Sequence, residues 1–470
     1  MHTIEQIFIN GKFVTPHGTE RFDLYNPATA QVIGQVRLAD EVDAARAVAA
    51  AKAAFPAWSQ TTKQERIAAL KRMHAAVAAR HDDLLEAVIE EYGAPASRSA
   101  WMASYPAEVI AQAIEALEAF EFVTPAGAAT VQMTPLGVAG LITPWNSDAG
   151  FICGKLAAAL AAGCTAVIKP SEMSALQTQI VTEALRDAAL PPGVFNIVTG
   201  RGETVGDTIS RHPDVAKISF TGSTHTGKAI LRNAAESFKR VTLELGGKSP
   251  TILLDDVDLA QAIPLVIQAG FMNSGQACVA GTRILVPYSR KAEIETALAQ
   301  AVAAVNSGDP RDKSTDVGPM VSAKQWQRVQ GYIRKGVEEG ARLLAGGEGR
   351  PEGTQDGWFV RPTLFADVNN QMTIARDEIF GPVLCVIPYR DEAEAIAIAN
   401  DTDYGLSAVV LGGADRARRV AQQIVSGRVL VNTLAHEPKA PFGGFKHSGV
   451  GREMGEWGIR AFMEPRSILG

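Results

Sequence analysis

Cys278 is the residue whose type and setting most favour covalent chemistry in this chain. It closes the polar, glycine-containing run NSGQAC at 273–278, which follows an apolar segment of helical spacing at 263–271. A turn presents its side chains, and a thiolate is the strongest nucleophile that a side chain offers near neutral pH. The alternative is a small buried hydrophobe, because free cysteine is among the most buried residue types. For a lone cysteine, that alternative is the commoner one.

A second stretch, LELGGKSP at 243–250, favours the chemical interpretation. It places the carboxyl group of Glu244 between two leucines, at the end of a strand-like run and directly before a pair of glycines. Burial among apolar neighbours raises the pKa of a carboxyl group, which suits a general base or acid. Together, Cys278 and Glu244 predict a nucleophile and a proton acceptor.

Seven motifs in chain order resemble those of one enzyme family. They are PWN at 144–146, KPSE at 169–172, FTGS at 220–223, LELGGKSP at 243–250, GQAC at 275–278, EIFGPV at 378–383 and PFGGFKHSG at 441–449. The set resembles the NAD(P)-dependent aldehyde dehydrogenase superfamily, non-acylating branch, over nearly the whole chain. The resemblance implies an α/β fold with a Rossmann-like cofactor domain, a second α/β catalytic domain and a small β oligomerisation arm.

The resemblance implies oxidation of an aldehyde to a carboxylic acid. Cys278 attacks the aldehyde carbon to form a thiohemiacetal, and Asn146 and the Cys278 backbone N–H stabilise its oxygen. Hydride transfer to the nicotinamide leaves a thioester, which a water activated by Glu244 hydrolyses. Lys155, nine residues after Asn146, is expected to help relay protons. Without the resemblance, Asn146 would be a turn residue and Lys155 a solvated helix residue.

Two glycine-containing turns have the sequence of a phosphate-binding loop. In the first, a strand-like run at 217–220 leads into TGSTHTGK at 221–228 and then into a helical pattern. Glycine lets backbone N–H groups approach an anion, and a helix start adds partial positive charge. The second, GRGETVG at 200–206, nearly spells the dinucleotide fingerprint GxGxxG but has one residue too many before Gly206.

The resemblance assigns the cofactor contacts residue by residue. Ser223 and the backbone after Gly222 meet the pyrophosphate, Lys169 and Glu172 meet the adenosine ribose, and Glu378 and Phe380 meet the nicotinamide side. The other expected contacts are Thr143, Trp145, Ser171, Gly202, Gly206, Phe220, Thr221 and Leu245. Because Glu172 would repel a 2′-phosphate, NAD is the preferred cofactor, and NADP stays compatible with the family pattern. Independently, Glu172 suits the start of a helix as an acid.

Composition and charge exclude several classes of partner. Of the 470 residues, 46% are hydrophobic, which is ample for several cores. The net charge is −6 and the sequence contains no basic stripe, so no nucleic-acid partner is expected. The N-terminus lacks signal-peptide features and the most apolar run, 151–168, contains Lys155, so no membrane partner is expected. The four cysteines lie far apart and form no CxxC pattern: Cys153, Cys164, Cys278 and Cys385. This spacing predicts no metal site and favours a reducing cytoplasm.

Strand-like runs alternate with helical patterns on both sides of residue 247, which predicts two parallel sheets. The first set lies at 138–143, 166–169, 194–198, 216–220 and 240–244, and the second at 251–254, 282–287, 384–389, 408–411 and 428–432. Two long helices are expected between 41 and 92, the first ending near Pro56, and a third from about 105 to 120. The predicted domains are NAD-binding (1–120 and 136–246), catalytic (247–448) and an oligomerisation arm (121–135 and 449–470).

The remaining segments bear on the oligomeric state and on the choice of substrate. The run at 464–470 is expected to form a strand that pairs with another subunit of a homodimer or homotetramer. SDAGF follows PWN where many relatives have an aromatic residue and a proline, and 433–439 is more polar than a fatty-aldehyde tunnel needs. Gly150 and Gly154 are expected to widen the channel. The alternatives are a CoA-acylating or phosphorylating relative, disfavoured by Glu244, and a catalytically inactive structural relative.

Overall fold

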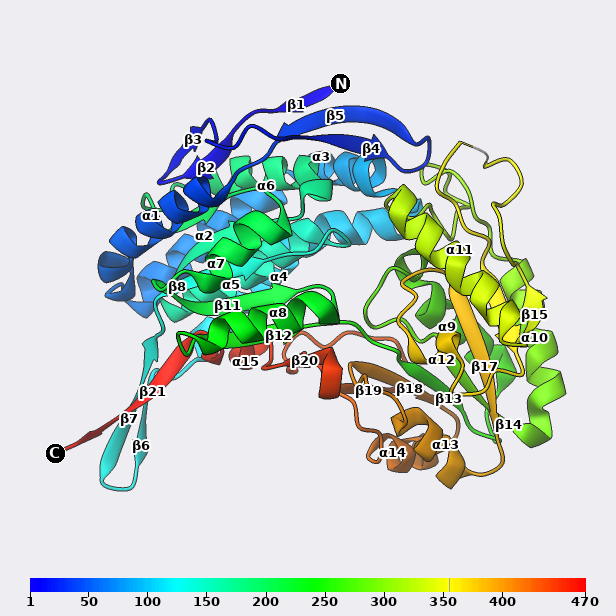
Figure 1. Cartoon of the computed structure of the whole chain (residues 1–470). Helices are drawn as coiled ribbons and strands as arrows, with labels where there is room; N and C mark the ends of the chain where they lie inside the picture. The colour runs from blue at the N-terminus through cyan, green and yellow to red at the C-terminus, as the bar shows by residue number, and fades with distance from the viewer. Residues whose placement is uncertain (355) are drawn as a thin grey trace.

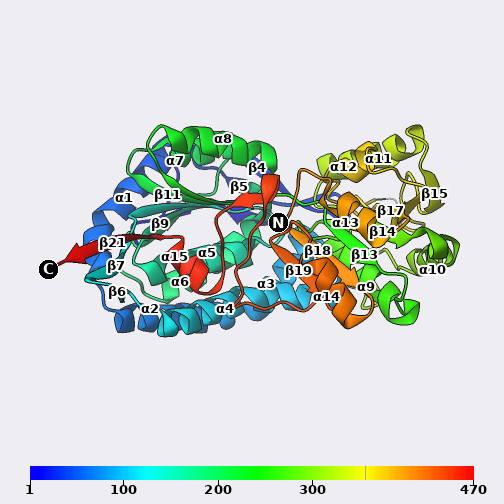
Figure 2. The same ribbon diagram turned by 90° about the horizontal axis from the view of Figure 1, so that it is seen from below.

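Two largely parallel β-sheets organise the chain, one in each of two lobes that lie side by side (Figures 1 and 2). The computed structural model describes residues 1–354 and 356–470. The α/β fold class expected from the alternating pattern is confirmed. Among the described residues, no helix has the length and apolar character needed to cross a membrane.

The first lobe is built on an eight-stranded sheet. In spatial order its strands are β20 (Gly449–Val450), β12 (Arg240–Glu244), β11 (Val215–Thr221), β8 (Val138–Ile142), β9 (Thr165–Lys169), β10 (Phe195–Ile197), β2 (Ile7–Ile9) and β3 (Lys12–Val14). The five strands from β12 to β10 run parallel, whereas β20, β2 and β3 are antiparallel to their neighbours. The parallel strands are apolar and buried, as expected for a sheet covered on both faces.

Helices cover both faces of this sheet. One face packs against α2 (Lys63–Ala78), α4 (Ala96–Ala119), α5 (Asp148–Ala162) and α6 (Ala175–Asp187). The other packs against α1 (Glu41–Ser59), α7 (Asp207–Arg211) and α8 (Thr224–Ala235). The remaining helical segments of the lobe are α3 (His81–Ala87), α15 (Gly455–Arg460), the π-helices η1 (Val88–Tyr92) and η3 (Gly202–Gly206), and the 3-10 helices η2 (Glu172–Ser174) and η6 (Lys446–Ser448). A small sheet, β1 (His2–Ile4), β5 (Gln31–Arg37) and β4 (Arg21–Asn26), lies above α3 (Figure 1).

The second lobe contains a seven-stranded sheet. In spatial order its strands are β15 (Arg342–Ala345), β16 (Thr363–Ala366), β17 (Val383–Tyr389), β14 (Arg283–Pro287), β13 (Pro250–Leu253), β18 (Ser407–Leu411) and β19 (Arg428–Val431). Its helices are α9 (Leu259–Phe271), α10 (Lys291–Ala303), α11 (Ala323–Glu338), α12 (Thr373–Arg376), α13 (Glu392–Asn400), α14 (Ala414–Ala421) and the 3-10 helices η4 (Met272–Gly275) and η5 (Tyr288–Arg290). Helices α9 and α10 cover one face of this sheet, and helices α11 to α14 cover the other face.

A three-stranded arm projects from the first lobe, with the C-terminus at its tip (Figure 1). It contains β6 (Val123–Ala126), β7 (Ala129–Pro135) and β21 (Met463–Leu469). The expected C-terminal strand is present and pairs with β7 of the same chain along its whole length. Its other edge pairs with no strand of the described residues, so the pairing with another subunit stays a prediction. Of the range 449–470 expected in the arm, β20 instead lies in the eight-stranded sheet.

Two expected helix boundaries are also wrong. The first helix runs through Pro56 to Ser59, because burial of Trp58 in the core offsets the backbone hydrogen bond that proline cannot make. The third helix begins at Ala96 and passes through Pro106, because Met102 and Ala103 add buried helical positions before the proline. The segments 346–354 and 356–357, which are rich in glycine, lie between β15 and β16, and residue 355 is outside the described residues.

Candidate active site

Cys278 follows a tightly held turn at the end of α9. Asn273, Ser274 and Gly275 have left-handed φ angles of 55°, 59° and 74°, which reverse the chain after the helix. The fully buried Gln276 then fixes the turn, since its side chain donates to the Tyr92 hydroxyl and the Pro319 carbonyl and accepts from the Val321 N–H. The thiol is thereby presented by a turn that its neighbours hold in one conformation.

Asn146 lies directly against this turn. Its side-chain Nδ2 donates to the Gln276 carbonyl at 3.0 Å, and its own carbonyl accepts from Asn273 Nδ2 at 3.2 Å. The NH₂ group has two donors, so one N–H is left for another acceptor. The structure therefore brings together two of the residues expected to act on one substrate carbonyl.

The unusual Asp148 has a positioning role in the same segment. It is fully buried and accepts from the hydroxyls of Thr143 at 2.6 Å and Thr178 at 2.8 Å. Burial raises the pKa of Asp148 to about 7, against the effect of these two hydrogen bonds. Asp148 thereby ties the end of β8, which leads to Asn146, to the start of α5 and to α6.

Glu244 occupies the end of β12 and is buried. Neither carboxylate oxygen has a hydrogen-bond partner among the described residues. Gly443 lies opposite this carboxyl group, and a side chain there would collide with it, because a Cβ at Gly443 would lie 2.7 Å from Glu244 Oε1. Burial raises the pKa of Glu244 well above its usual value, the charge of Glu453 raises it further, and Lys155 and Arg452 oppose the rise. When ionised, a carboxylate with a raised pKa is a stronger proton acceptor than an exposed one.

Lys155 is buried on α5 and is not the solvated residue that its sequence alone suggested. Its ammonium donates to Ser219 Oγ at 2.9 Å and to Glu453 Oε1 at 2.5 Å, and Ser219 also donates to Glu453 at 2.9 Å. Sequence reasoning missed Glu453, although it lies only four residues after the last motif that carried the resemblance. The network provides charge and exchangeable protons close enough to Glu244 to influence its pKa.

The environment of Cys278 keeps its thiol neutral. Burial raises the pKa of Cys278 to about 12, the charges of Glu378 and Glu244 raise it further, and Arg428 lowers it. The backbone N–H of Cys278 also lowers the pKa of the thiol. A proton acceptor is therefore needed before this thiol can act as a nucleophile.

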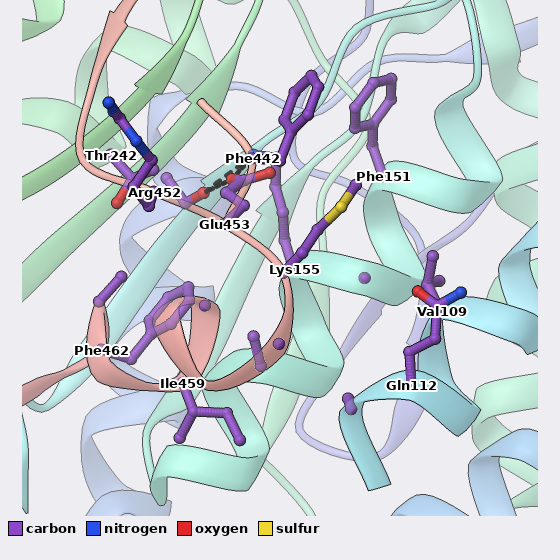
Figure 3. Close-up of a pocket in the computed structure, with 18 of the residues that line it drawn as sticks. Val109, Gln112, Phe151, Lys155, Thr242, Phe442, Arg452, Glu453, Ile459 and Phe462 are labelled. Atoms are coloured by element: carbon purple, nitrogen blue, oxygen red, sulfur yellow. Dashed lines mark hydrogen bonds and ion pairs between the residues drawn. The ribbon is translucent and has the colours of Figure 1, made fainter. Parts of the chain in front are cut away.

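A pocket lies beside the Lys155–Glu453 pair, between α4, α5 and α15 (Figure 3). Its walls are mainly apolar, and the labelled side chains include Phe151, Phe442, Val109, Ile459 and Phe462. The two glycines expected to widen a channel differ. A Cβ at Gly150 would meet the Tyr105 ring at 2.6 Å, so Tyr105 already fills that space, whereas a Cβ at Gly154 would meet Val109 at an ordinary 3.6 Å.

Residues expected at the adenosine ribose gather at the carboxyl end of β9. Lys169 Nζ lies 3.5 Å from Glu172 Oε2, and Arg201 Nη1 lies 3.4 Å from Glu172 Oε1. Ser171 caps the short helix η2 by accepting from the Met173 N–H. Arg201, which also pairs with Glu20 at 2.7 Å, was not singled out from the sequence. This edge of an open parallel sheet is where α/β proteins bind nucleotides.

The residues expected at the pyrophosphate follow β11. Ser223 caps α8 by accepting from the Thr226 N–H, and Thr221 Oγ1 is buried without a partner among the described residues. A Cβ at Gly222 would lie 2.5 Å from the Phe220 ring, so only glycine fits above that ring. The other expected positions are a core leucine and two glycines of the π-helical turn near Lys169: Leu245, Gly202 and Gly206.

Glu378 and Phe380 connect the second lobe to this edge. Glu378 Oε1 accepts from the Gly247 N–H at 3.0 Å, and a Cβ at Gly246 would lie 2.2 Å from Glu378 Oε2. Burial raises the pKa of Glu378 to about 7, against the effect of the Gly247 hydrogen bond. Phe380 has a left-handed φ of 61°, and its ring lies edge-on to Trp145 with centroids 5.4 Å apart. Strain of this kind clusters at functional sites.

Comparison with known proteins identifies the family. The aldehyde dehydrogenase family model matches residues 13–468. The chain belongs to the aldehyde dehydrogenase family. It is 43% identical over 473 residues to the 3-succinoylsemialdehyde-pyridine dehydrogenase of a Pseudomonas species, covering 100% of this chain and 99% of that protein.

Solved structures of the family are similar over the whole length. A mutant of aldehyde dehydrogenase C from Pseudomonas syringae, complexed with NAD+ and octanal, is 44% identical with a TM-score of 0.98, covering 100% of this chain and 97% of that one. An NAD+ complex of a Mycobacterium tuberculosis aldehyde dehydrogenase is 41% identical with a TM-score of 0.96, covering 99% and 98%. The family and the fold expected from the seven motifs are thus confirmed. In residues 1–354 and 356–470, no group of three or more His, Cys, Asp or Glu side chains is arranged to hold a metal ion.

Proposed function

We propose that this enzyme oxidises an aldehyde to the carboxylic acid with NAD+, through a thioester on Cys278. The observation that carries the proposal is the direct contact of Asn146 with the Cys278 turn, beside a buried carboxyl group, Glu244, that has no partner among the described residues. These groups supply a nucleophile, a donor for the developing oxyanion and a proton acceptor. Each is needed at a different stage of the reaction.

In the first stage, Cys278 Sγ forms a bond to the aldehyde carbon, and the thiol proton passes to Glu244 directly or through water. The carbonyl oxygen takes up the electron pair and becomes negatively charged. The remaining N–H of Asn146 and the backbone N–H of Cys278 are the donors in this account. Loss of one such donor typically costs about 10²- to 10³-fold in rate.

NAD is the cofactor that suits the residues at the carboxyl edge of the first sheet. The unpartnered Thr221 hydroxyl and the exposed cap Ser223 suit a polar ligand at the start of α8, and Glu172 is available to accept from ribose hydroxyls. Lys169 and Arg201 hold Glu172 in place. The bound nicotinamide supplies a hydride acceptor. The NAD+ complexes of similar proteins support this assignment.

In the last stage, Glu244 takes a proton from water, and the hydroxide attacks the thioester carbon. Collapse of that adduct releases the carboxylic acid and returns the sulfur to Cys278 as a thiolate. The Lys155–Glu453 pair, with Ser219, offers a route by which the proton on Glu244 reaches solvent. Glu244 also favours hydrolysis over transfer to CoA, which is the alternative activity, because an acyl-transferring enzyme has no use for a water-activating base.

The test is NADH formation from a panel of aldehydes without CoA. We expect Cys278→Ala to abolish NADH formation while the affinity for NAD+ stays close to that of the native enzyme. Cys385→Ala, which removes a buried thiol from β17, is the matched control and should retain turnover. NADH formation within tenfold of the native rate in Cys278→Ala contradicts the proposal, and a strict need for CoA favours the acylating alternative.

We further propose a cytoplasmic homodimer or homotetramer. The four cysteines are all free thiols, which suits a reducing compartment. The projecting arm ends in β6, whose four residues are all exposed and whose outer edge pairs with no described strand. Light scattering coupled to gel filtration measures the mass directly, and a monomer at micromolar concentration contradicts this part of the proposal.

A further inference from the structure

The guanidinium group of Arg428 lies close to the reacting groups and forms no ion pair with any described residue. It opens β19, and its Nε donates to Ser407 Oγ at 3.3 Å. No acid among residues 1–354 and 356–470 lies within ion-pair distance of it, and its two terminal amino groups donate to none of those residues. By contrast, Arg283 of β14 donates to four acceptors, and Arg452 donates to two backbone carbonyls.

The backbone next to Arg428 is packed against the catalytic region. A Cβ at Gly427 would lie 1.7 Å from the Gly443 carbonyl oxygen, and a Cβ at Gly443 would lie 2.7 Å from Glu244 Oε1. Two glycines therefore allow the start of β19 to approach the general base through one intervening chain segment. Arg428 is also near enough to Cys278 for its charge to lower the pKa of the thiol.

The side chain of Arg428 lies against Phe442, which lines the pocket, although Arg428 itself is not one of the lining residues. Its Cζ lies 5.8 Å from the centroid of the Phe442 ring, and Phe442 lines the pocket together with Phe151 (Figure 3). Stacking on an aromatic ring fixes the plane of a guanidinium and leaves its edge free for a carboxylate. Arg428 thus combines an orienting contact with unused donors.

Arg428 and its neighbour His436 are both partly removed from water. Burial lowers the pKa of His436, Arg428 lowers it further and Glu437 opposes this, so His436 lies within the field of Arg428. Burial likewise lowers the pKa of Arg428, and negative charge on Cys278 or Tyr105 acts in the opposite direction. An unpaired guanidinium that is partly removed from water is costly unless an anion accompanies it.

We infer that Arg428 binds a carboxylate on the substrate, so that the preferred substrates are aldehydes with an acid group at the far end of the chain. This inference rests on the proposed aldehyde oxidation. The guanidinium would pair with the remote carboxylate while the aldehyde carbon meets Cys278. A bidentate pair of this kind fixes both the position and the orientation of the chain.

The test compares ω-oxo acids of four to eight carbons with n-alkanals of equal carbon number, in the full-length enzyme with NAD+. The readout is the ratio of kcat/KM for the oxo acid to kcat/KM for the matched alkanal. A change in the reactivity of Cys278 alters both values alike and cancels in the ratio. We expect the native enzyme to favour the oxo acid by at least about tenfold at one chain length, in line with charge-assisted hydrogen bonds.

Arg428→Gln should lower this ratio by about 10- to 100-fold, and Arg428→Lys, which keeps the charge but loses the fork, should lower it less. Arg416→Gln removes a guanidinium of the same lobe that is already paired with Asp255 and Glu392 and does not line the pocket, and it should leave the ratio within about threefold of native. The inference is overturned if alkanals are used as well as every oxo acid, or if Arg428→Gln leaves the ratio unchanged.

Glutarate binding measured by calorimetry separates this inference from the proposed function. Weaker glutarate binding in Arg428→Gln supports a carboxylate site even if no aldehyde yields NADH, a result that would contradict the proposed function alone. Equal glutarate affinity in the native enzyme and both Arg428 variants overturns the carboxylate site, whatever the turnover. If Arg428→Gln fails to fold, Arg428→Lys provides the same comparison.

Discussion

Replacing Glu172 with serine should shift the enzyme from NAD towards NADP. The side chain of Glu172 is 19% exposed and holds two cations, Lys169 at 3.5 Å and Arg201 at 3.4 Å. A 2′-phosphate in the same place would meet like charge. Serine removes the repulsion and at the same time releases both cations to pair with the phosphate.

The size of the shift follows from Coulomb's law. Two unit charges about 4 Å apart near a protein surface interact by about 4 kcal/mol. Salt and partial exposure reduce this by roughly half, to about 2 kcal/mol, which corresponds to about 30-fold in a ratio of rates. Loss of the hydrogen bonds to the ribose hydroxyls of NAD adds to the change in the same direction.

The assay measures kcat/KM for NADP and for NAD with one aldehyde at a fixed salt concentration, and compares their ratio. Glu20→Ser is the matched control, because Glu20 also pairs with Arg201 but is 52% exposed, and we expect it to change the ratio less than threefold. Adding Arg201→Gln to Glu172→Ser should remove much of the gain. An unchanged ratio in Glu172→Ser, or an equal change in Glu20→Ser, would refute this reasoning.

Three further predictions concern stability. Burial raises the pKa of Glu244 above its value in the unfolded chain, so the folded protein binds the Glu244 carboxyl proton more tightly. This proton binding stabilises the fold fully at pH values below the unfolded pKa, about 4.3. The stabilisation is lost as the pH rises through the folded pKa. The Tm of Glu244→Gln relative to the native protein should therefore increase from about pH 5 to about pH 9, and a difference independent of pH would show that the carboxyl is not so perturbed. Lys155→Met should cost about 3 kcal/mol in the free energy of unfolding by leaving its carboxylate partner unpaired, and a loss below about 1 kcal/mol in denaturant titration would contradict a strong buried pair. Gly150→Ala should cost about 1–3 kcal/mol through overlap with Tyr105, whereas Gly154→Ala should stabilise by up to about 1 kcal/mol; equal effects in urea would show that the two sites pack alike.

The sequence allowed the sheets to be predicted where burial is nearly continuous. Strands such as β8 and β9 are buried at every position, so they appear as unbroken apolar runs bounded by turns. The short strand β15 was missed, because it carries only four residues, none fully buried, and a glycine-rich loop follows it. The strand β16 was missed although all four of its residues are buried, because so short an apolar run is not specific for a strand. Pro56 was taken as a helix end, although burial of the following Trp58 outweighs the preference of proline.

The motifs allowed Cys278, Asn146 and Glu244 to be proposed from the sequence, because each lies close to a local turn or a strand end. Residues that reach the site through long side chains from distant segments were not identified. Glu453 lies 298 residues from its partner Lys155, and only the packing of α15 and β20 against the first lobe brings the two together. Arg428 is similar, since the approach of β19 to Gly443 decides which region its guanidinium faces. No local spacing encodes such contacts.

The central claim is that the substrate becomes a thioester on Cys278 that Glu244 is needed to hydrolyse. It is tested most directly by intact-protein and peptide mass spectrometry of Glu244→Gln after mixing with NAD+ and an aldehyde. Glutamine keeps the shape of the side chain but cannot take a proton from water, so we expect about one NADH per active site, followed by turnover slowed by about 10²-fold or more. The protein should gain the mass of the aldehyde minus two hydrogens, on the peptide that contains Cys278. Undiminished steady-state turnover without this adduct, or an adduct on another residue, would contradict the account.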